Sequence, residues 1–160
     1  MVRFEQVDKT YLKNGRSVTA LQHINVDIAA GSVFGIIGHS GAGKSTLLRL
    51  INGLEAPTSG RLNVLGQDLA QASAAELKAL QKQIGMVFQH FNLLDSKTVF
   101  ENVAFPLRLK KINASEIARR TTQALEHTSL LDVASKSPAD LSGGGKQRVA
   151  LARALAINPS

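Results

Sequence analysis

The sequence contains no cysteine, no tryptophan and a single tyrosine, and aromatic residues make up only 4% of it. The absence of cysteine excludes a disulfide framework and any metal site built on thiolates. Basic residues outnumber acidic ones, 19 to 12, and give a formal net charge of +7. These basic residues are scattered along the chain and are not interleaved with aromatic residues. They therefore do not predict a surface on which the bases of single-stranded nucleic acid would stack. We therefore expect no nucleic-acid partner.

Long apolar runs are also missing. The longest, VFGIIG and LLRLINGL, are too short or too charged to cross a bilayer. The N-terminal stretch MVRFEQVDKTY contains an acidic residue and no apolar core, so it is not typical of a secretion signal. Any connection with a membrane is therefore expected to run through a partner. The 44% hydrophobic and 19% charged content is typical of a globular domain with a core.

The hydrophobic pattern predicts an α/β fold. Apolar and polar residues alternate in VRFEQV (2–7) and HINVDI (23–28), which predicts half-buried strands. The continuous apolar runs VFGIIG (33–38) and IGMVFQ (84–89) predict strands buried on both faces, as in a parallel sheet. A further short strand is expected over RLNVLG (61–66).

Helix start and stop signals account for much of the remaining chain. KSTLLRLIN (44–52) has a helical pattern that Gly53 is suited to end. Ser73 and Glu76 have the spacing of a capping box, which predicts a helix running to about Gln83.

The stretch after residue 89 has a different character. Thr98 and Glu101 form a second capping box, and we expect Pro106 to end that short helix. SEIARRTTQALEHTSL (115–130) has the apolar spacing of a surface helix. No stretch of residues 90–140 predicts a strand convincingly, so we interpret this region as a helical insertion in the α/β domain.

A glycine-rich segment between a predicted strand and a predicted helix carries a phosphate-binding pattern. Gly38, Gly43, Lys44 and Ser45 fit G-x-x-x-x-G-K-[ST]. In such a loop the backbone N–H groups point at the β-phosphate, the lysine reaches the β- and γ-phosphates, and the hydroxyl binds Mg²⁺. Alone, the loop predicts only that a nucleoside triphosphate binds. The predicted binding residues here are Gly38, His39, Ser40, Gly41, Ala42, Gly43, Lys44, Ser45 and Thr46.

A second glycine-rich segment indicates which class of nucleotide-binding protein this is. LSGGGKQRVALARAL (141–155) resembles the signature motif of the ABC ATPase family, whose usual form is LSGGQ. Gln89 lies where that family has its Q-loop glutamine, and Tyr11 lies where it has an aromatic residue that stacks on adenine. The resemblance covers essentially the whole chain. It implies ATP and Mg²⁺ as cofactors, with Gln89 and Ser45 as metal ligands and Tyr11 on the base.

The resemblance also implies a partner. In this family two nucleotide-binding domains pair head to tail, and the signature motif of one closes the ATP site of the other. Ser142, Gly143 and Gly144 are therefore expected to contact the ATP of a second copy of the chain. Gly145 departs from the family pattern, which usually has glutamine at that position, so one side-chain contact is missing.

The family's Walker B aspartate and glutamate and its switch histidine follow the signature helix, and they are expected beyond Ser160. The resemblance thus implies an ABC ATPase, a P-loop NTPase fold, without its C-terminal part and with no catalytic residue present. We expect residues 1–160 to bind ATP without hydrolysing it alone. Residues 1–89 are assigned to an N-terminal antiparallel β subdomain and the P-loop core, 90–140 to a helical subdomain, and 141–160 to the signature motif and its helix.

QHFNLLDSKTVFENVAFPLRL (89–109) and IIGHSGAGKST (36–46) are similar to the ATP-binding subunits of bacterial methionine importers. This resemblance implies a peripheral position on the cytoplasmic face of the inner membrane. It also implies permease subunits bound through the Q-loop and helical subdomain, and a substrate-binding protein reached indirectly. The alternatives are a soluble ABC ATPase acting in translation or DNA repair, or a non-catalytic fragment. Four apolar residues are candidates either for the permease groove or for the core: Phe91, Leu93, Leu94 and Phe100.

Overall fold

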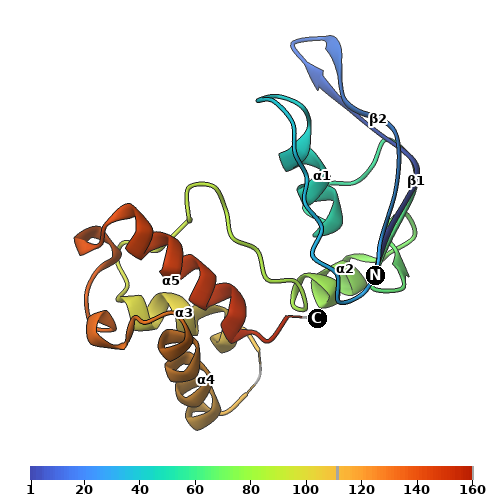
Figure 1. Ribbon diagram of the computed structural model, residues 1–160. Helices are drawn as coiled ribbons and strands as arrows, with labels where there is room; N and C mark the ends of the chain where they lie inside the picture. The colour runs from blue at the N-terminus through green and yellow to red at the C-terminus, as the bar shows by residue number, and fades with distance from the viewer. Residues whose placement is uncertain (111, 160) are drawn as a thin grey trace. The chain divides into compact units, whose positions relative to one another are not determined.

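The computed structural model describes residues 1–110 and 112–159, and it divides into two units, residues 1–81 and 82–160 (Figure 1). This division falls before the boundary expected after residue 89. The functional assignment of the three predicted segments remains a prediction.

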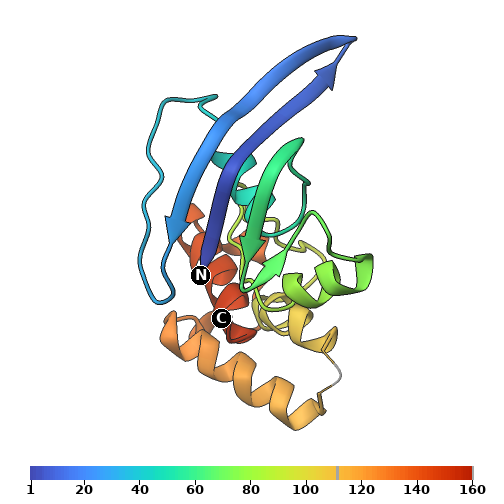
Figure 2. The same cartoon turned by 90° about the vertical axis from the view of Figure 1, so that its right-hand side faces the viewer.

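An antiparallel sheet forms one side of the first unit. Its strands are β1 (Val2–Lys13), β2 (Arg16–Ile28), β3 (Ser59–Val64) and β4 (Gln67–Asp68). They are ordered β2-β1-β3-β4, and each neighbouring pair is antiparallel (Figure 2). The strands predicted from alternation lie within β1 and β2, and the one predicted from RLNVLG overlaps β3. These predictions are confirmed.

The hairpin between β1 and β2 is longer than the alternating pattern indicates. Lys13 pairs with Arg16 across a two-residue loop of Asn14 and Gly15, whose φ angles are 51° and 73°. Both residues are in the left-handed region, as a type I′ hairpin turn requires. The Asn-Gly pair was the sequence signal for this turn, and it is what extends both strands beyond residues 2–7 and 23–28.

Helix α1 (Lys44–Ile51) packs against β2 and buries Leu47 and Leu50. It ends where predicted, because Gly53 adopts a φ of 64° and donates its N–H to the carbonyl of Leu50. Left-handed glycine after the last turn is a common way to satisfy the free carbonyls of a helix. The helix is thereby ended at Gly53.

Helix α2 (Ala74–Gln81) begins with the predicted capping box. The N–H of Glu76 donates to Ser73 Oγ at 3.3 Å, and the N–H of Ser73 donates to the Glu76 carboxylate at 2.8 Å. The helix ends before Gln83, earlier than predicted, and one residue in it, Leu80, is buried.

Two predicted strands are absent from the described structure. Residues 33–38 and 84–89 have irregular backbone. The side chains of Val33 and Ile37 are 103% and 96% exposed, and that of Val87 is 42% exposed. An apolar run favours burial, but a strand also needs a hydrogen-bonded neighbour, and no described segment pairs with either run. The prediction of strands here is therefore wrong for this chain.

The second unit is helical. Its helices are α3 (Val99–Arg108), α4 (Ala114–His127) and α5 (Gly143–Ala156), with short 3₁₀ turns at Leu131–Val133 and Pro138–Asp140. No strand occurs among residues 90–110 and 112–140, which confirms the helical interpretation of that region. In the described ranges no helix is both long and apolar enough to cross a membrane.

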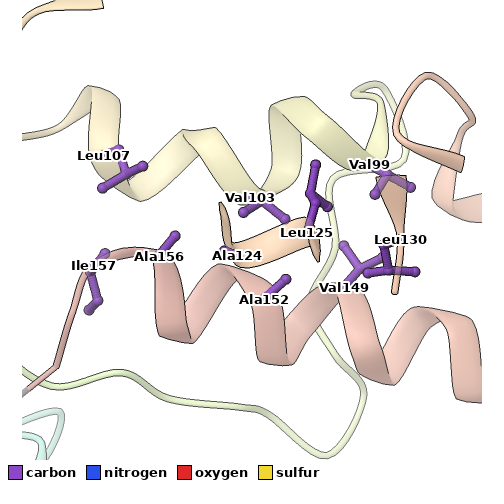
Figure 3. Close-up of a cluster of buried hydrophobic side chains, with 10 residues drawn as sticks. All are labelled: Val99, Val103, Leu107, Ala124, Leu125, Leu130, Val149, Ala152, Ala156 and Ile157. Atoms are coloured by element: carbon purple, nitrogen blue, oxygen red, sulfur yellow. The ribbon is translucent and has the colours of Figure 1, made fainter. Parts of the chain in front are cut away.

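The core of this unit lies among its three helices, because α3, α4 and α5 each pack against the other two (Figure 3). The helix that follows the signature motif is thus an integral part of this core. The buried cluster consists of Val99, Val103, Leu107, Ala124, Leu125, Leu130, Val149, Ala152, Ala156 and Ile157.

The start of α3 confirms its predicted capping box, and its end corrects a prediction. Thr98 accepts a hydrogen bond from the N–H of Glu101, whose carboxylate accepts one from the N–H of Thr98. Pro106 does not end the helix, which continues to Arg108. Proline removes its own N–H bond to the carbonyl of Asn102 and crowds that carbonyl with its ring. Burial of Leu107 in the core keeps the last residues helical despite this loss.

Candidate nucleotide-binding site

The glycine-rich segment forms an exposed loop that leads into α1. Gly43 is the N-cap of this helix in a left-handed conformation, with φ of 86°, and no side chain caps the helix. The first N–H groups of an α-helix have no partner within the helix, and they carry its positive dipole end. No acidic residue lies in the first turn of α1. An anion such as phosphate fits this position, because it would satisfy those donors.

The close approach of Gly43 to the sheet explains why glycine is needed there. A Cβ atom at this position would lie 2.5 Å from the carbonyl oxygen of Ala20 and 2.8 Å from Leu21 Cδ2. Any other residue would push the loop away from β2. The second glycine of the motif therefore sets how the glycine-rich segment sits on its own sheet.

Lys44 folds back over the loop. Its Nζ donates hydrogen bonds to the carbonyl oxygens of Gly38 and His39, both at 2.7 Å. The ammonium group thus lies at the loop, where it can attract an anion, and its carbonyl bonds can be exchanged for phosphate oxygens. His39 contacts the carbonyl of Ser40 through Nδ1 at 2.7 Å, while Ser45 is exposed in the first turn of α1.

Tyr11, on β1, is connected to the same helix. Its hydroxyl contacts the hydroxyl of Thr46 at 3.4 Å and donates a hydrogen bond to the carboxylate of Glu55. Thr46 lies in the first turn of α1 and Glu55 follows its C-terminal end. The structure thus brings Tyr11 to the helix that carries the loop. Stacking of its ring on adenine remains a prediction.

Glu55 is a residue that the sequence analysis missed. Burial raises its pKa, but hydrogen bonds from Tyr11 and Arg49 and the charge of Lys9 outweigh this effect, so the pKa of Glu55 lies below its ordinary value. Burial, followed by the hydrogen bond to Glu55, raises the pKa of Tyr11. Both changes favour an ionised carboxylate that accepts a hydrogen bond from a neutral phenol. A glutamate after a glycine-ended helix gives no sequence signal for such a contact.

Gln89 lies in the other unit, in an exposed position of the irregular segment. Its predicted role as a metal ligand beside Ser45 therefore remains a prediction. Among the described residues no group of three or more histidine, aspartate and glutamate side chains is arranged to hold a metal. The exposed hydroxyl of Ser45 is an oxygen ligand of the kind that Mg²⁺ prefers.

The signature segment forms a second open helix start. Ser142 is the N-cap of α5, and its Oγ accepts a hydrogen bond from the N–H of Gly145 at 3.3 Å. Gly143 and Gly144 are exposed, and a Cβ atom on either would meet nothing within 4 Å. Their backbone N–H groups are therefore accessible to an external anion. Gly145 is buried, and a Cβ atom there would lie 3.1 Å from Leu141 Cβ.

A second missed residue connects the signature helix to the segment after Gln89. Arg153, on α5, donates to the carbonyl oxygens of Phe91 and Asn92, each at 2.6 Å. These two residues have left-handed φ angles of 60° and 47°, and burial lowers the pKa of Arg153. Charge-assisted bonds to both carbonyls stabilise this turn, and the position of Arg153 on α5 links it to the signature helix.

The four apolar candidates for a permease groove differ in their burial. Leu93 and Phe100 pack against the buried cluster of the second unit, whereas Leu94 is 37% exposed. Phe91 lies in the turn held by Arg153 and is partly buried. Leu93 and Phe100 are thus accounted for by core packing.

Comparison with known proteins identifies the family. A family model described as ABC transporter matches residues 21–160. The chain belongs to the ABC transporter family. The methionine import ATP-binding protein MetN of Caulobacter vibrioides is 54% identical over 159 residues, covering 99% of this chain and 47% of the relative. MetN 1 of Pseudomonas putida is 54% identical over 160 residues, covering 99% of this chain and 48% of the relative.

Solved structures of ABC transporter proteins have the same fold. A dimeric ATP-binding cassette, described as a post-hydrolysis state bound to ADP and Pi, has a TM-score of 0.92 at 38% identity, covering 99% of this chain and 71% of that one. CbiO1 of Clostridium perfringens, described as part of the ABC transporter complex cbiONQ, has a TM-score of 0.85 at 32% identity, covering 99% of this chain and 62% of that one. The predicted ABC ATPase fold class is confirmed.

The comparisons also confirm the resemblance to the methionine-importer subunits within this family. The chain spans about half the length of the curated relatives it matches. The activity, substrate and partners of the whole protein are therefore treated below as proposals.

Proposed function

We propose that this ABC transporter chain is the nucleotide-binding part of the ATP-binding subunit of a bacterial methionine importer. The observation that carries this proposal is the open N-terminus of α1, with Gly43 packed against Ala20 and with Lys44 folded over the loop. The resemblance to MetN proteins over 99% of the chain supports the importer assignment. A soluble ABC ATPase of translation or DNA repair is not favoured by these relatives.

In this proposal the chain's own residues hold the triphosphate of ATP. The N–H groups of the loop and of the first turn of α1 bind the β-phosphate, and Lys44 leaves the carbonyls of Gly38 and His39 to contact phosphate oxygens. Ser45 and Gln89 would hold Mg²⁺, which neutralises phosphate charge when bound. Tyr11 stacks against the base. The water-polarising carboxylate of the family is assigned to a part of the protein outside these residues.

The open start of α5 serves a partner's nucleotide in this proposal. Ser142, Gly143 and Gly144 present accessible groups at a helix N-terminus, where an external anion can bind. A second copy of the chain would pair head to tail so that each ATP lies between the loop of one copy and the signature of the other. The structure described as a dimeric ATP-binding cassette supports this arrangement.

Energy from ATP would then reach a permease. We infer that transmembrane subunits bind at the Q-loop and the helical unit, at the cytoplasmic face of the inner membrane, and that a substrate-binding protein delivers methionine to them. The CbiO1 structure, described as part of a transporter complex, supports a peripheral subunit of this kind. Arg153 holds the turn at Phe91 and Asn92. In this proposal, binding of a permease subunit at this turn would be transmitted to α5 through Arg153.

The test uses the full-length protein with its permease. Lys44→Ala should abolish Mg-ATP binding in calorimetry and ATP-driven methionine uptake into membrane vesicles, because the loop loses the only side-chain cation that contacts it among the described residues. Lys13→Ala, at the exposed hairpin tip, is the matched control and should change neither. Unchanged ATP affinity in Lys44→Ala would contradict the site, and uptake of a different solute would contradict the importer assignment.

A further inference from the structure

We propose that Glu55 is a positioning residue for the nucleotide base. Its carboxylate holds the hydroxyl of Tyr11, so that the ring is fixed relative to the phosphate loop with one face turned to adenine. This inference rests on the proposed function, and it adds to it the residue that orients the base platform.

The first support is that Tyr11 is anchored to both ends of α1. Its hydroxyl contacts Thr46 in the first turn and Glu55 just beyond the last turn. The N–H of Glu55 in turn donates to the carbonyl of Arg49 at 3.1 Å, which fixes the glutamate backbone to the helix. The ring on β1 is therefore coupled to the helix whose N-terminus forms the phosphate site.

The second support is that the carboxylate is itself held in place. Arg49 donates to Glu55 Oε1 at 3.4 Å, and Lys9 Nζ lies 3.5 Å from Oε2. The side chains of Lys9 and Glu55 are only 15% and 18% exposed. An ionised acceptor at low exposure makes a stronger hydrogen bond than a neutral one in water, so the phenol is oriented firmly.

The third support concerns the faces of the Tyr11 ring. Lys9 Nζ lies 5.0 Å from the ring centroid, within the range of a cation–π contact. The same Nζ donates to the carbonyl of Ala56 at 2.8 Å, which keeps the ammonium group in place. One face of the ring is thus taken by Lys9, so in this proposal adenine stacks on the opposite face.

The consequence is a fixed spacing between base and phosphates. Thr46 lies two residues after Lys44, so movement of Tyr11 away from Thr46 and Glu55 would change the distance from the stacked ring to the loop. Disrupting the contact between Glu55 and Tyr11 should therefore weaken the contribution of the base to ATP affinity and leave the contribution of the phosphates intact. If the carboxylate only stabilised the fold, its loss would weaken the base contribution and the phosphate contribution to affinity alike.

The experiment compares two probes in the full-length protein: Mg-ATP and the base-free Mg-tripolyphosphate. Glu55→Gln keeps the shape of the side chain and removes its charge. We expect ATP affinity to fall about tenfold, equivalent to about 1.4 kcal/mol, while tripolyphosphate affinity stays within about twofold. Tyr11→Phe keeps the ring and removes the hydroxyl, so it should give the same selective loss. The double variant should lose little more than either single variant.

A matched control and a spectroscopic measurement complete the test. Asp27→Asn breaks the ion pair of Arg3 and Asp27 in the same sheet, at 2.7 Å, without touching Tyr11, and should change neither affinity. With ¹³C-labelled tyrosine, the Tyr11 resonance, assigned by its loss in Tyr11→Phe, should shift in Glu55→Gln and not in Asp27→Asn.

Two results would overturn the inference. Equal losses of affinity for both probes in Glu55→Gln would show that the contact only supports α1. An unchanged ratio of the two affinities in Tyr11→Phe would show that the hydroxyl does not orient the ring. If wild-type protein binds neither probe, or binds both independently of Lys44, the proposed function itself fails, and this inference fails with it.

Discussion

Gly43 joins the glycine-rich loop to α1 with a φ of 86°, and the position of its missing Cβ faces the backbone of β2. We expect Gly43→Ala to destabilise the protein by about 2 kcal/mol or more, because it adds a clash with Ala20 to the left-handed backbone penalty. Gly41→Ala is the matched control, since Gly41 has a φ of 82° and nothing within 4 Å of its Cβ position.

That control isolates the backbone penalty, which is about 1–2 kcal/mol. Urea denaturation of the full-length protein measures both variants. Equal losses for Gly41→Ala and Gly43→Ala would contradict the close approach to β2. At the residue scale, the motif pattern identified Gly43 from the sequence. The neighbour that makes glycine necessary there is Ala20, which lies far away in the sequence on β2 and belongs to no motif.

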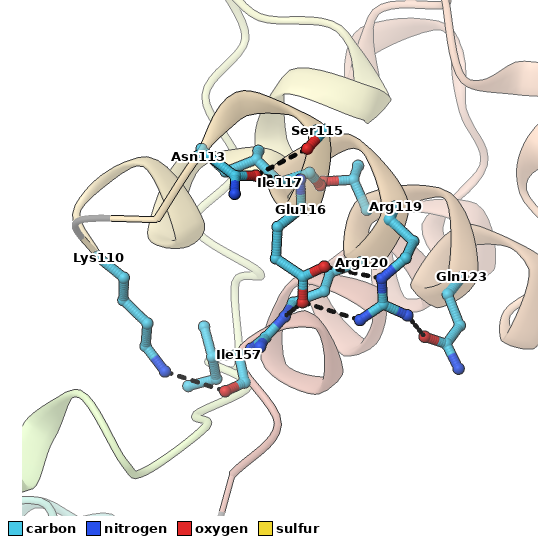
Figure 4. A network of polar contacts seen from close by, with 10 residues as sticks. Lys110, Asn113, Ser115, Glu116, Ile117, Arg119, Arg120, Gln123 and Ile157 are labelled. Atoms are coloured by element: carbon cyan, nitrogen blue, oxygen red, sulfur yellow. Dashed lines mark hydrogen bonds and ion pairs between the residues drawn. The ribbon is translucent and has the colours of Figure 1, made fainter.

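Among the elements, α4 carries an acidic residue with an unusual environment (Figure 4). The side chain of Asn113 caps the helix by accepting from the N–H of Glu116, and the Glu116 carboxylate accepts from Arg119 at 2.8 Å and from Arg120 at 2.6 Å. Hydrogen bonds from Arg119 and then Arg120 lower the pKa of Glu116 from 4.5 to about 2. Because this pKa is depressed in the folded state, its stabilising effect is present above pH 4.5 and is lost as the pH falls through about 2.

We therefore expect Glu116 to titrate near pH 2 when its carboxyl resonance is followed by NMR. Replacing both arginines, in Arg119→Gln with Arg120→Gln, should raise this pKa toward its ordinary value and weaken the acid-side loss of stability. Lys78→Gln on α2 removes an exposed cation elsewhere and should leave the titration unchanged. Titration of wild-type Glu116 near 4.5 would show that the arginine contacts do not persist in solution.

The elements also show where sequence patterns succeed. Capping boxes at Ser73 and Thr98 and the helix end at Gly53 depend on residues within a few positions of each other, and the structure contains all three. The strands expected at 33–38 and 84–89 depend on partner backbones, and the described chain provides none. Local hydrogen bonds can be predicted from local sequence, whereas strand pairing cannot.

At the scale of the whole molecule, the open start of α5 should matter only when two copies meet. Ser142→Arg in the full-length protein places a bulky cation where the partner's phosphate would approach, and leaves Lys44 and Tyr11 untouched. ATP affinity of the monomer should stay within about threefold, which is below roughly 0.7 kcal/mol. ATP-dependent dimerisation, measured by light scattering, and phosphate release should collapse.

Ser142 also caps α5 through its contact with Gly145, so a second variant is needed. Ser142→Ala removes the cap without adding bulk and should destabilise by about 1 kcal/mol. It should keep more of the dimerisation than Ser142→Arg does. Loss of monomer binding with intact dimerisation would instead assign the segment to the site of its own chain.

The sequence by itself determined the family, the glycine-rich pattern at residues 38–46, and the capped starts of α2 and α3. Each of these depends on residue types at fixed short spacings, which can be read directly from the sequence. Only the tertiary structure decided that Glu55 anchors Tyr11 and that Arg153 clamps the turn at Phe91. These contacts join residues that are 44 and 62 positions apart. Chain folding sets such distances, and no local pattern of charge or hydrophobicity encodes them.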